Sequence, residues 1–257
     1  MPKPTPWEDE YTLLCERCGY VLEGLDQAGV CPECGKPIAE SLPGARPGTP
    51  YQQKPGFKSL IQTAWMTVHC PKKILETMCF EGDNSPPRSP LAAYLTYTVI
   101  ACVGLVMFSV VGNSISVMDI AIFLGIMTII GFLIWAAFFI VTIACAYIIH
   151  FISMLFKGRN DAEVSWVIAG HASIGWTFTG FTWVAGWSID RLIHSLVPTH
   201  SQWHLRIQTM TLIDSVIVPT FIGGIILGSL IFLYITYLGI IHTRYINPIP
   251  PQEPSNG

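Results

Sequence analysis

A long apolar run at 120–156 constrains the fold of this chain more than any other feature. It reads IAIFLGIMTIIGFLIWAAFFIVTIACAYIIHFISMLF and contains no Asp, Glu, Lys, Arg or Pro. Helices in soluble cores rarely stay apolar on every face beyond about 14 residues, whereas about 20 apolar residues are needed to cross a hydrocarbon layer. The run therefore predicts a transmembrane segment.

The length of this run leaves two arrangements open, one overlong helix or two short spans. At about 1.5 Å per residue, its roughly 37 residues would form about 55 Å of helix, and a hydrocarbon core is only about 30 Å thick. Cytoplasmic flanks are enriched in Lys and Arg. Among the basic residues after position 50, a single crossing leaves only Arg191 and Arg206 outside. Two crossings would instead place Lys157, Arg159 and Arg244 outside, so the charges favour one long helix with both termini in the cytoplasm.

The composition is that of a membrane protein rather than a soluble enzyme. Of 257 residues, 51% are hydrophobic and 12% charged, with a mean hydropathy of +0.48, and this charged share is about half that of soluble domains. Further apolar segments lie at 90–112, 164–187 and 212–241. We therefore expect an all-α bundle of about four transmembrane helices over 90–246. The first residues lack the apolar core of a secretory signal, so we expect a multi-pass protein of the bacterial inner membrane.

Two CxxCG pairs, Cys15 with Cys18 and Cys31 with Cys34, predict a metal site near the N-terminus. Two thiolates separated by two residues can bind one ion, and the following Gly tolerates the left-handed backbone that brings amides near the sulfurs. Zinc suits four thiolates because it has no redox chemistry and accepts tetrahedral geometry. The spacing between the pairs is slightly short, so a rubredoxin-like iron site stays open. We expect a zinc ribbon over 1–38, with a β-hairpin between its knuckles.

The string CERCGYVLEGLDQAGVCPECGKPI resembles a ribbon that recurs at the N-terminus of many otherwise dissimilar bacterial membrane proteins. That resemblance implies metal binding and assigns no function. Residues 1–40 carry three basic and eight acidic side chains, so phosphate would be repelled and nucleic acid is not expected as a partner. A cytoplasmic protein partner, or a purely structural cap, fits this charge better.

Between and after these parts, three segments differ in composition. Residues 39–56 are rich in Pro, Gly and Ser without a hydrophobic period, which predicts a flexible linker. Residues 57–89 place apolar side chains at helical spacing with lysines at the polar edge. This pattern predicts amphipathic helices that lie at the membrane interface or pack on other helices. Residues 247–257 are expected to be a disordered tail.

The pattern of spans and junctions resembles the Yip family of small multi-span membrane proteins. It covers about 57–246, with the lead segment WMTVHCPKKILETM, a Pro-led first span, a second span ending HFISMLFKGRND, a Gly- and aromatic-rich third span and a last span ending YLGIIHTRYI. The chain departs from the family in how its junctions end and in lacking a clear fifth span. The resemblance implies a helical membrane bundle and, in eukaryotic members, roles in vesicle trafficking and membrane shaping.

Ionisable groups at membrane depth are costly and are therefore candidates for function. His171 and Asp214 form a possible intramembrane polar site, with helix packing and a helix-start position as the structural alternatives. Gly224-x-x-x-Gly228 predicts close helix packing, within the fold or in a homo-oligomer. The sequence contains no GxSxG, HExxH, P-loop or Rossmann motif, so we expect no enzyme activity.

Two functions of different classes fit these features. The first is a membrane scaffold or membrane-organising protein, embedded in the lipid bilayer, that displays the cytoplasmic zinc ribbon to a protein partner. The second is a small transporter or channel that uses the third and fourth spans around His171.

Overall fold

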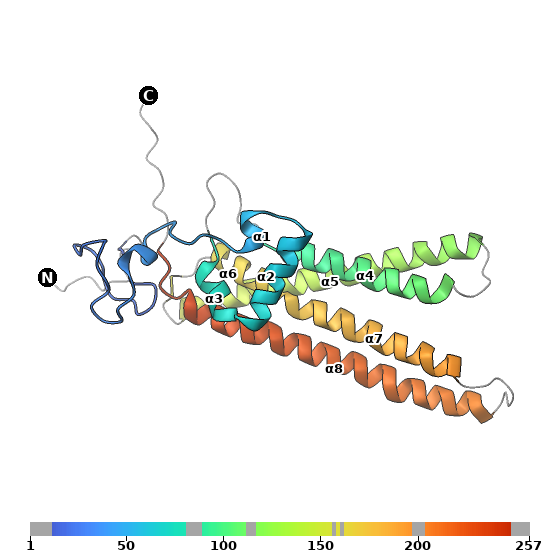
Figure 1. Cartoon of the computed structure of the whole chain (residues 1–257). Coiled ribbons are helices and arrows are strands. Elements are labelled where there is room, and N and C mark those ends of the chain that lie inside the picture. The colour runs from blue at the N-terminus through green and yellow to red at the C-terminus, as the bar shows by residue number, and fades with distance from the viewer. Residues whose placement is uncertain are drawn as a thin grey trace. The chain divides into compact units, whose positions relative to one another are not determined.

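The structure is a computed structural model, in which the described part of the chain forms helices and no β-strand (Figure 1). It describes residues 12–80, 89–111, 117–155, 158–159, 162–196 and 204–247. The elements are the 3₁₀ turn η1 (Ile38–Ser41) and the helices α1 (Pro50–Gln53), α2 (Phe57–His69), α3 (Pro71–Thr77), α4 (Leu91–Val111), α5 (Val117–Leu155), α6 (Ala162–Ala172), α7 (Ile174–Leu196) and α8 (His204–His242).

The chain divides into two compact units, and the long helices α5 and α8 contribute to both. The first unit contains Met1–Pro90, Ile143–His171 and Tyr234–Gly257. The second contains Leu91–Thr142 and Ala172–Leu233. Each unit is described by itself.

The apolar run at 120–156 forms one continuous helix over its described residues, which confirms the single-helix prediction. This helix, α5, is 39 residues long and would extend about 58 Å at the α-helical rise of about 1.5 Å per residue. It contains no Pro that would end it, and its described outward side chains are apolar on several faces, with Ile129, Phe132 and Ile140 each more than 60% exposed.

Among the described residues, two helices are long and apolar enough to cross a membrane, Leu124–Leu155 within α5 and Val218–His242 within α8. Leu91–Gly104 in α4 is apolar but shorter. The third predicted span, 164–187, is divided between α6 and α7 at Ser173, whose carbonyl accepts a hydrogen bond from the Trp176 N–H at 3.0 Å. Ser and Gly are weaker helix formers than Ala or Leu, and the sequence Ser-Ile-Gly at this point permits the break.

The first unit packs its short helices around an apolar core. Pro71 opens α3 at a position where its missing N–H has no helical partner to lose, and Ile74, Leu75 and Met78 on one side of this segment are fully buried. They pack with side chains from α6, α8 and the flanking loops, namely Phe80, Val164, Val167, Ile168, Leu238 and Ile246.

The stretch 39–56, which its composition predicts to be a flexible linker, makes specific polar contacts within the first unit. Arg46 Nη2 lies 3.0 Å from Glu16 Oε2, and Arg46 Nη1 donates to the Leu75 carbonyl at 2.8 Å. Gln52 Nε2 donates to the Cys79 carbonyl at 2.6 Å. Amino-acid composition indicates how much apolar surface a segment can bury and where it can turn. It does not show which individual polar side chains form hydrogen bonds or ion pairs.

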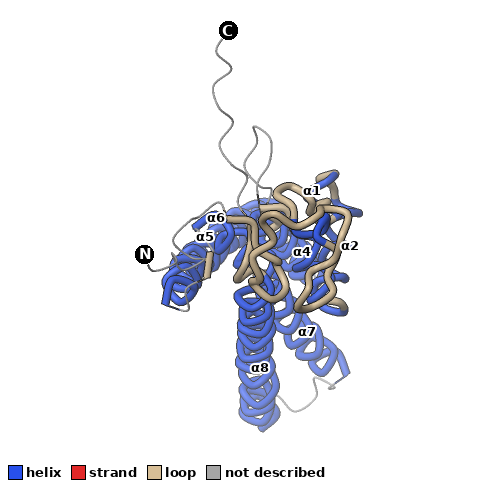
Figure 2. The backbone as a smooth tube through the Cα atoms, turned by 90° about the vertical axis from the view of Figure 1, so that its left-hand side faces the viewer, coloured by secondary structure: helices blue, strands red, loops and turns tan. Residues whose placement is uncertain are grey.

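In the second unit, α4, α7 and the adjoining parts of α5 and α8 lie side by side (Figures 1 and 2). Glycines allow the close approaches. A methyl group added at Gly180 of α7 would meet the Thr98 methyl of α4 at 2.5 Å, and one added at Gly131 of α5 would meet Val99 of α4 at 2.9 Å.

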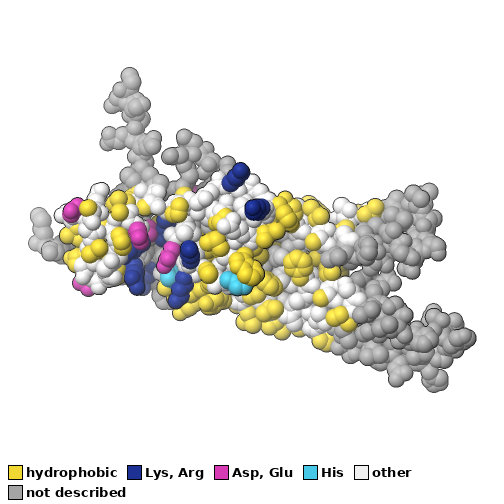
Figure 3. Space-filling view, in the orientation of Figure 1, with side chains coloured by type: hydrophobic (Ala, Val, Ile, Leu, Met, Phe, Trp, Pro, Cys, Tyr) yellow, Lys and Arg dark blue, Asp and Glu magenta, His cyan; other side chains and the backbone are white. Residues whose placement is uncertain are grey.

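Charged and apolar side chains are segregated on the surface (Figure 3). The charged side chains gather over the ribbon and the short helices, and apolar side chains cover the visible described parts of the long helices. An apolar outer surface of this extent is unusual for a soluble monomer and typical of contact with lipid or other protein.

Candidate metal centre

Four thiols meet at one point in the ribbon. The sulfur atoms of Cys15, Cys18, Cys31 and Cys34 all lie within 4.8 Å of one another. Cys15 Sγ is 3.5 Å from Cys34 Sγ, and Cys18 Sγ is 3.6 Å from Cys31 Sγ. Four sulfurs held about 2.3 Å from a tetrahedral ion would be about 3.8 Å apart. The spacing therefore fits a single metal ion, and all eight cysteines of the chain are free thiols.

Each CxxCG pair forms its own knuckle with the same hydrogen bonds. Gly19 N donates to the Cys15 carbonyl at 2.8 Å and Gly35 N to the Cys31 carbonyl at 2.9 Å. Both glycines have positive φ, 76° and 71°, in the left-handed region that side chains disfavour. The CxxCG pattern thus specifies the turn that brings its two thiols together.

The β-hairpin predicted between the knuckles is not present in the described ribbon, whose backbone is drawn as loop in Figure 2. Two isolated antiparallel bridges occur instead, Leu14 with Val21 and Val30 with Pro37. Each bridge closes its own knuckle rather than pairing one knuckle with the other. The intervening segment contains Gly24 at a φ of 77° and consists of turns, because it is too short and too polar to bury a strand face.

The thiols differ in pKa because their surroundings differ. Desolvation of the sulfur, together with the neighbouring thiols, raises the pKa of Cys18 to about 12, and burial raises the pKa of Cys15. Burial acts in the same direction on Cys31, but the backbone N–H groups of Cys34 and Glu33 and the other thiols outweigh it and lower the pKa of Cys31 to about 7. An ion that binds here must displace protons from the thiols that are still protonated.

Residues that follow α8 and α5 hold the first knuckle within the first unit. The Asn247 amide accepts from Leu14 N at 2.8 Å and donates to the Leu14 and Ser41 carbonyls, both at 2.7 Å. Arg159 Nη1 donates to the Thr12 carbonyl at 2.6 Å. Asn247 is buried and lies 233 residues from Leu14 in the sequence. Sequence reasoning missed this contact, since no local pattern marks an asparagine that satisfies a distant backbone.

Glu16, between the two cysteines of the first knuckle, is the centre of a second attachment. It is 8% exposed and forms ion pairs with Lys36 of the second knuckle at 3.4 Å and with Arg46 at 3.0 Å. Arg46 also lies over the Phe80 ring, 5.2 Å from its centroid. The pairs satisfy a buried carboxylate that would otherwise be costly.

A polar groove of about 660 Å³ adjoins these ion pairs within the first unit. Because Lys36 and Arg46 are engaged with Glu16, the charged lining that remains is balanced in sign. It comprises the exposed side chains of Arg17, Glu40, Lys72 and Glu76, with His242 nearby.

His171 is fully buried at the end of α6. Its Nδ1 lies 2.9 Å from the Val167 carbonyl, and its Nε2 lies 3.5 Å from Thr49 Oγ1. Since a carbonyl only accepts, Nδ1 carries the proton in this arrangement and Nε2 accepts from the hydroxyl, which assigns a neutral ring. Thr49 is in turn the N-cap of α1, within a capping box with Gln52. These contacts favour a packing role over a relay.

The remaining predicted positions lie in α8. Asp214 falls in this helix, and its side chain lies outside the described residues. Gly224 and Gly228 face α7: an added methyl at Gly224 would clash with Thr182, and one at Gly228 would clash with Thr179 and the backbone of Gly175. In the structure, the motif serves packing within the chain.

Comparison with known proteins assigns no family. No protein-family model matches the chain, and neither a curated protein nor a solved structure is significantly similar to it. Functional inference therefore rests on the metal centre, the groove and the apolar surface.

Proposed function

We propose that this protein is an integral membrane scaffold of the bacterial inner membrane that presents a zinc-loaded ribbon to a cytoplasmic protein. The observation that carries the proposal is the attachment of the four-thiol site to the same unit as the groove, through Glu16 and Asn247. A metal that fixes the knuckles also fixes one wall of the groove. The ribbon is thus a binding surface packed within the first unit, rather than a separate domain on a flexible linker.

Zinc is the metal that the donor set favours. Four thiolates at tetrahedral spacing suit zinc or iron, and a scaffold needs no redox change. Elemental analysis of the purified protein should return about one equivalent of zinc, and one equivalent of iron would instead support a rubredoxin-like centre. Replacement of Cys15 and Cys31 by serine should remove the metal.

Membrane embedding is supported by α2 as well as by the long helices. The helix buries polar Thr63 and Thr67 completely and exposes Phe57, Ile61 and Trp65 by 58%, 53% and 64%. An amphipathic helix in water has the opposite arrangement. We infer that this face lies in the bilayer interface, where the exposed Lys54 and Lys58 can meet anionic headgroups.

The groove is where we place the protein partner. Its lining has two basic and two acidic side chains besides the engaged pairs, so it suits a polar segment that carries both signs of charge. The acidic ribbon disfavours nucleic acid. A small transporter or channel around His171 is less well supported, because both ring nitrogens of this buried histidine have protein partners.

Site-specific photocrosslinking in living cells tests this function. A photoreactive amino acid at Arg17 or Lys72, both in the groove, is expected to form one discrete adduct with a protein, and the same residue at Gln27, exposed elsewhere on the ribbon, is not. The adduct should disappear in a Cys15→Ser, Cys31→Ser background. Adducts that are the same at all three positions, or that persist without the metal site, would contradict the proposal.

A further inference from the structure

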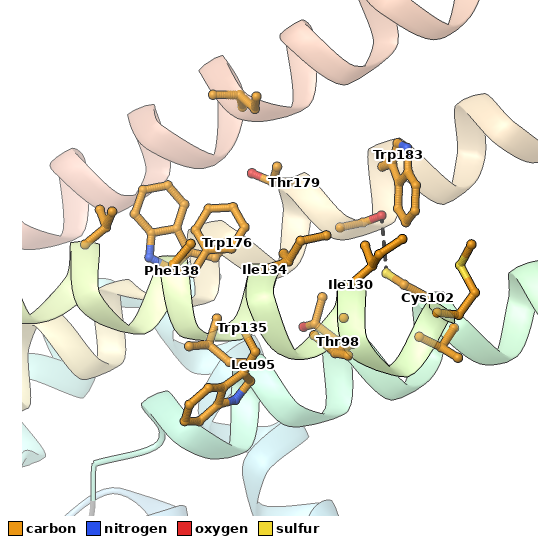
Figure 4. A pocket seen from close by; sticks show the side chains of 18 residues that line it. Leu95, Thr98, Cys102, Ile130, Ile134, Trp135, Phe138, Trp176, Thr179 and Trp183 are labelled. Carbon is orange, nitrogen blue, oxygen red and sulfur yellow. Dashed lines mark hydrogen bonds between the residues drawn. The ribbon is translucent and has the colours of Figure 1, made fainter. Parts of the chain in front are cut away.

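The second unit encloses an apolar cavity of about 440 Å³ between α4, α5, α7 and α8 (Figure 4). Its volume lies within the roughly 300–1,000 Å³ of small-molecule sites. Trp176 and Phe138 lie toward one end, and Trp183 and Cys102 toward the other. The Trp176 ring is fixed at its end, because its Nε1 donates to Thr142 Oγ1 at 3.0 Å and the ring stacks on Phe232 with centroids 5.1 Å apart.

Thr98, Thr179, Cys102 and Trp176, which line the cavity, have protein partners for their polar atoms. Thr98 Oγ1 bonds the Tyr94 carbonyl at 2.7 Å and lies 3.1 Å from Thr177 Oγ1. Thr179 Oγ1 donates to the Gly224 carbonyl at 3.1 Å.

Cys102 and Trp176 are engaged in the same way. Cys102 Sγ lies 3.6 Å from the Gly180 carbonyl, and the Trp176 indole bonds Thr142. A water molecule needs two to four polar partners to be held in a cavity, and a polar ligand would leave its own groups unpaired. The lining therefore selects a ligand without hydrogen-bonding groups.

The cavity opens along a helix that is apolar enough to cross the membrane. Ile130 and Ile134 of α5 line it and are 40% and 39% exposed, within the candidate span Leu124–Leu155. Gly180 allows α7 to approach α4 closely beside the cavity, since a methyl at this position would press on Thr98 and Cys102. Hydrocarbon chains are the surrounding medium at such a position, and an unfilled space would forfeit dispersion contacts on all its walls.

We propose that this cavity binds one acyl chain of a membrane phospholipid, which inserts between α4, α5 and α7 past Ile130 and Ile134. The inference rests on the membrane embedding in the proposed function but not on the ribbon or its partner. The headgroup stays outside the described cavity, so recognition is of a linear hydrocarbon chain and not of a particular lipid class.

Carbene photolabelling of the full chain in phospholipid vesicles tests the proposal. The probe is a phosphatidylcholine with a diazirine in one acyl chain, and labelled residues are identified by peptide mass spectrometry. We expect labels on Trp176 and Thr179, which are only 8% and 4% exposed and line the cavity. Labels are also expected on Phe132 and Ile140, which are both 64% exposed and do not line it.

Neighbouring alanines of α5 provide a matched pair of variants. Ala137 lines the cavity and Ala136 does not, so Ala137→Phe should reduce labelling of Trp176 several-fold and Ala136→Phe should leave it unchanged. Ile134→Trp, a second cavity-filling change, should act like Ala137→Phe, and continued labelling of Phe132 shows that a variant is still folded and embedded.

Three results would overturn the proposal. Wild-type labelling confined to Phe132 and Ile140 would show an embedded protein with no chain in the cavity. Labelling of Trp176 that neither filling variant changes would show that the chain reaches this ring by another route. Absence of label throughout α5 would overturn the membrane embedding itself, and with it the proposed function.

Discussion

At the scale of single residues, the two knuckle glycines share one backbone conformation but differ in the atoms that surround them. Gly19 and Gly35 adopt nearly the same positive φ. A methyl group at Gly35 meets nothing within 4 Å, whereas one at Gly19 would lie 2.8 Å from the Tyr245 ring. The first knuckle is therefore packed against the segment that follows α8, and the second knuckle is open at the corresponding point.

This difference predicts a ranking of two substitutions. Gly35→Ala should destabilise the ribbon by about 1–2 kcal/mol through its backbone alone. Gly19→Ala carries the same cost and, in addition, displaces Tyr245, which typically adds about 1–3 kcal/mol. Release of the bound metal ion to a chelator, followed as a function of temperature, measures the effect of both substitutions. Equal effects of the two variants would show that Gly19 is not packed on Tyr245.

The thiol pKa values predict how metal affinity changes with pH. Cys18, with a pKa of about 12, is protonated across the whole range from pH 6 to 9 and loses its proton only to the metal. Cys15, whose pKa is raised by burial, adds a second displaced proton, and Cys31, with a pKa of about 7, adds a third below about pH 7. Affinity should therefore rise with pH, by about tenfold per unit for each displaced proton, and more steeply below pH 7. Competition with a chelator at pH 6, 7 and 8 measures the metal affinity. An affinity that does not change with pH would contradict the assignment of protonated thiols.

At the scale of elements, the arrangement of α2 is informative because it buries Thr63 and Thr67 beside Leu60, whereas its large apolar side chains Phe57, Ile61 and Trp65 are exposed. Tyr51 N donates to Thr63 Oγ1 at 3.0 Å, and Thr67 Oγ1 donates to the Thr63 carbonyl at 2.7 Å. These bonds satisfy the inward hydroxyls, so the helix has no need to bury its apolar side against protein. Trp65 instead stacks on His69 at the surface, with centroids 3.6 Å apart.

An environment-sensitive fluorescent amino acid can report which side of α2 meets lipid. At Ile61, on the exposed apolar side, its emission should shift to the blue when the full chain is placed in anionic vesicles. At Gln62, the adjacent exposed polar position, the emission should stay close to that in water. Neutral vesicles should weaken the effect at Ile61, since Lys54 and Lys58 lose their counter-charges. Equal emission at both positions would argue that α2 does not lie at the interface.

Packing of α7 on α8 gives a second test at this scale, because adjacent glycines differ in their surroundings. A methyl at Gly223 meets nothing within 4 Å, whereas one at Gly224 collides with Thr182. Gly224→Ala should lower the stability of the helix pair by about 1–3 kcal/mol. Gly223→Ala should be neutral or raise stability by up to about 1 kcal/mol, through helix propensity. Thermal unfolding in detergent compares the two variants. Similar unfolding curves would show that Gly224 is not packed closely on Thr182.

At the scale of the first unit and of the whole chain, the N-terminal ribbon and the residues after α8 form one structure. Asn247 satisfies two backbone groups of the ribbon at Leu14 and the carbonyl of Ser41 just after it, and Arg159, just after α5, satisfies the Thr12 carbonyl. Such polar contacts are specific, since each buried group needs its partner at hydrogen-bonding distance. The metal site is thereby joined to the ends of both long helices.

Removal of the Asn247 amide should release the ribbon. Asn247→Ala leaves buried backbone groups of Leu14 and Ser41 without partners, at a cost of about 1–3 kcal/mol for each group. Hydrogen exchange of residues 12–22 should become faster, with exchange in α7 unchanged. Gln27→Ala, at an exposed ribbon position, serves as the control. Unchanged exchange in Asn247→Ala would show that the knuckle is held by other contacts.

The sequence alone was enough for those features whose physical cause is local or periodic. The CxxCG spacing predicted the four thiols, because each pair and its glycine define one turn. The apolar run predicted a single α5, because the flanking basic residues favour one crossing and only Gly125 and Gly131 within the run favour a turn. The number of spans, the Yip resemblance and the protein partner stay predictions.

Only the tertiary structure decided which distant groups meet. Arg46 binds the stretch 39–56 to Glu16, and Asn247 attaches the ribbon through Leu14. The Thr49 cap of α1 contacts the buried His171 ring. These contacts join residues far apart in the chain. The groups that meet are backbone atoms or single side chains, which produce no periodic pattern or motif in the sequence. Local preferences set each element, whereas the pairing of buried polar groups set how the elements of each unit are joined.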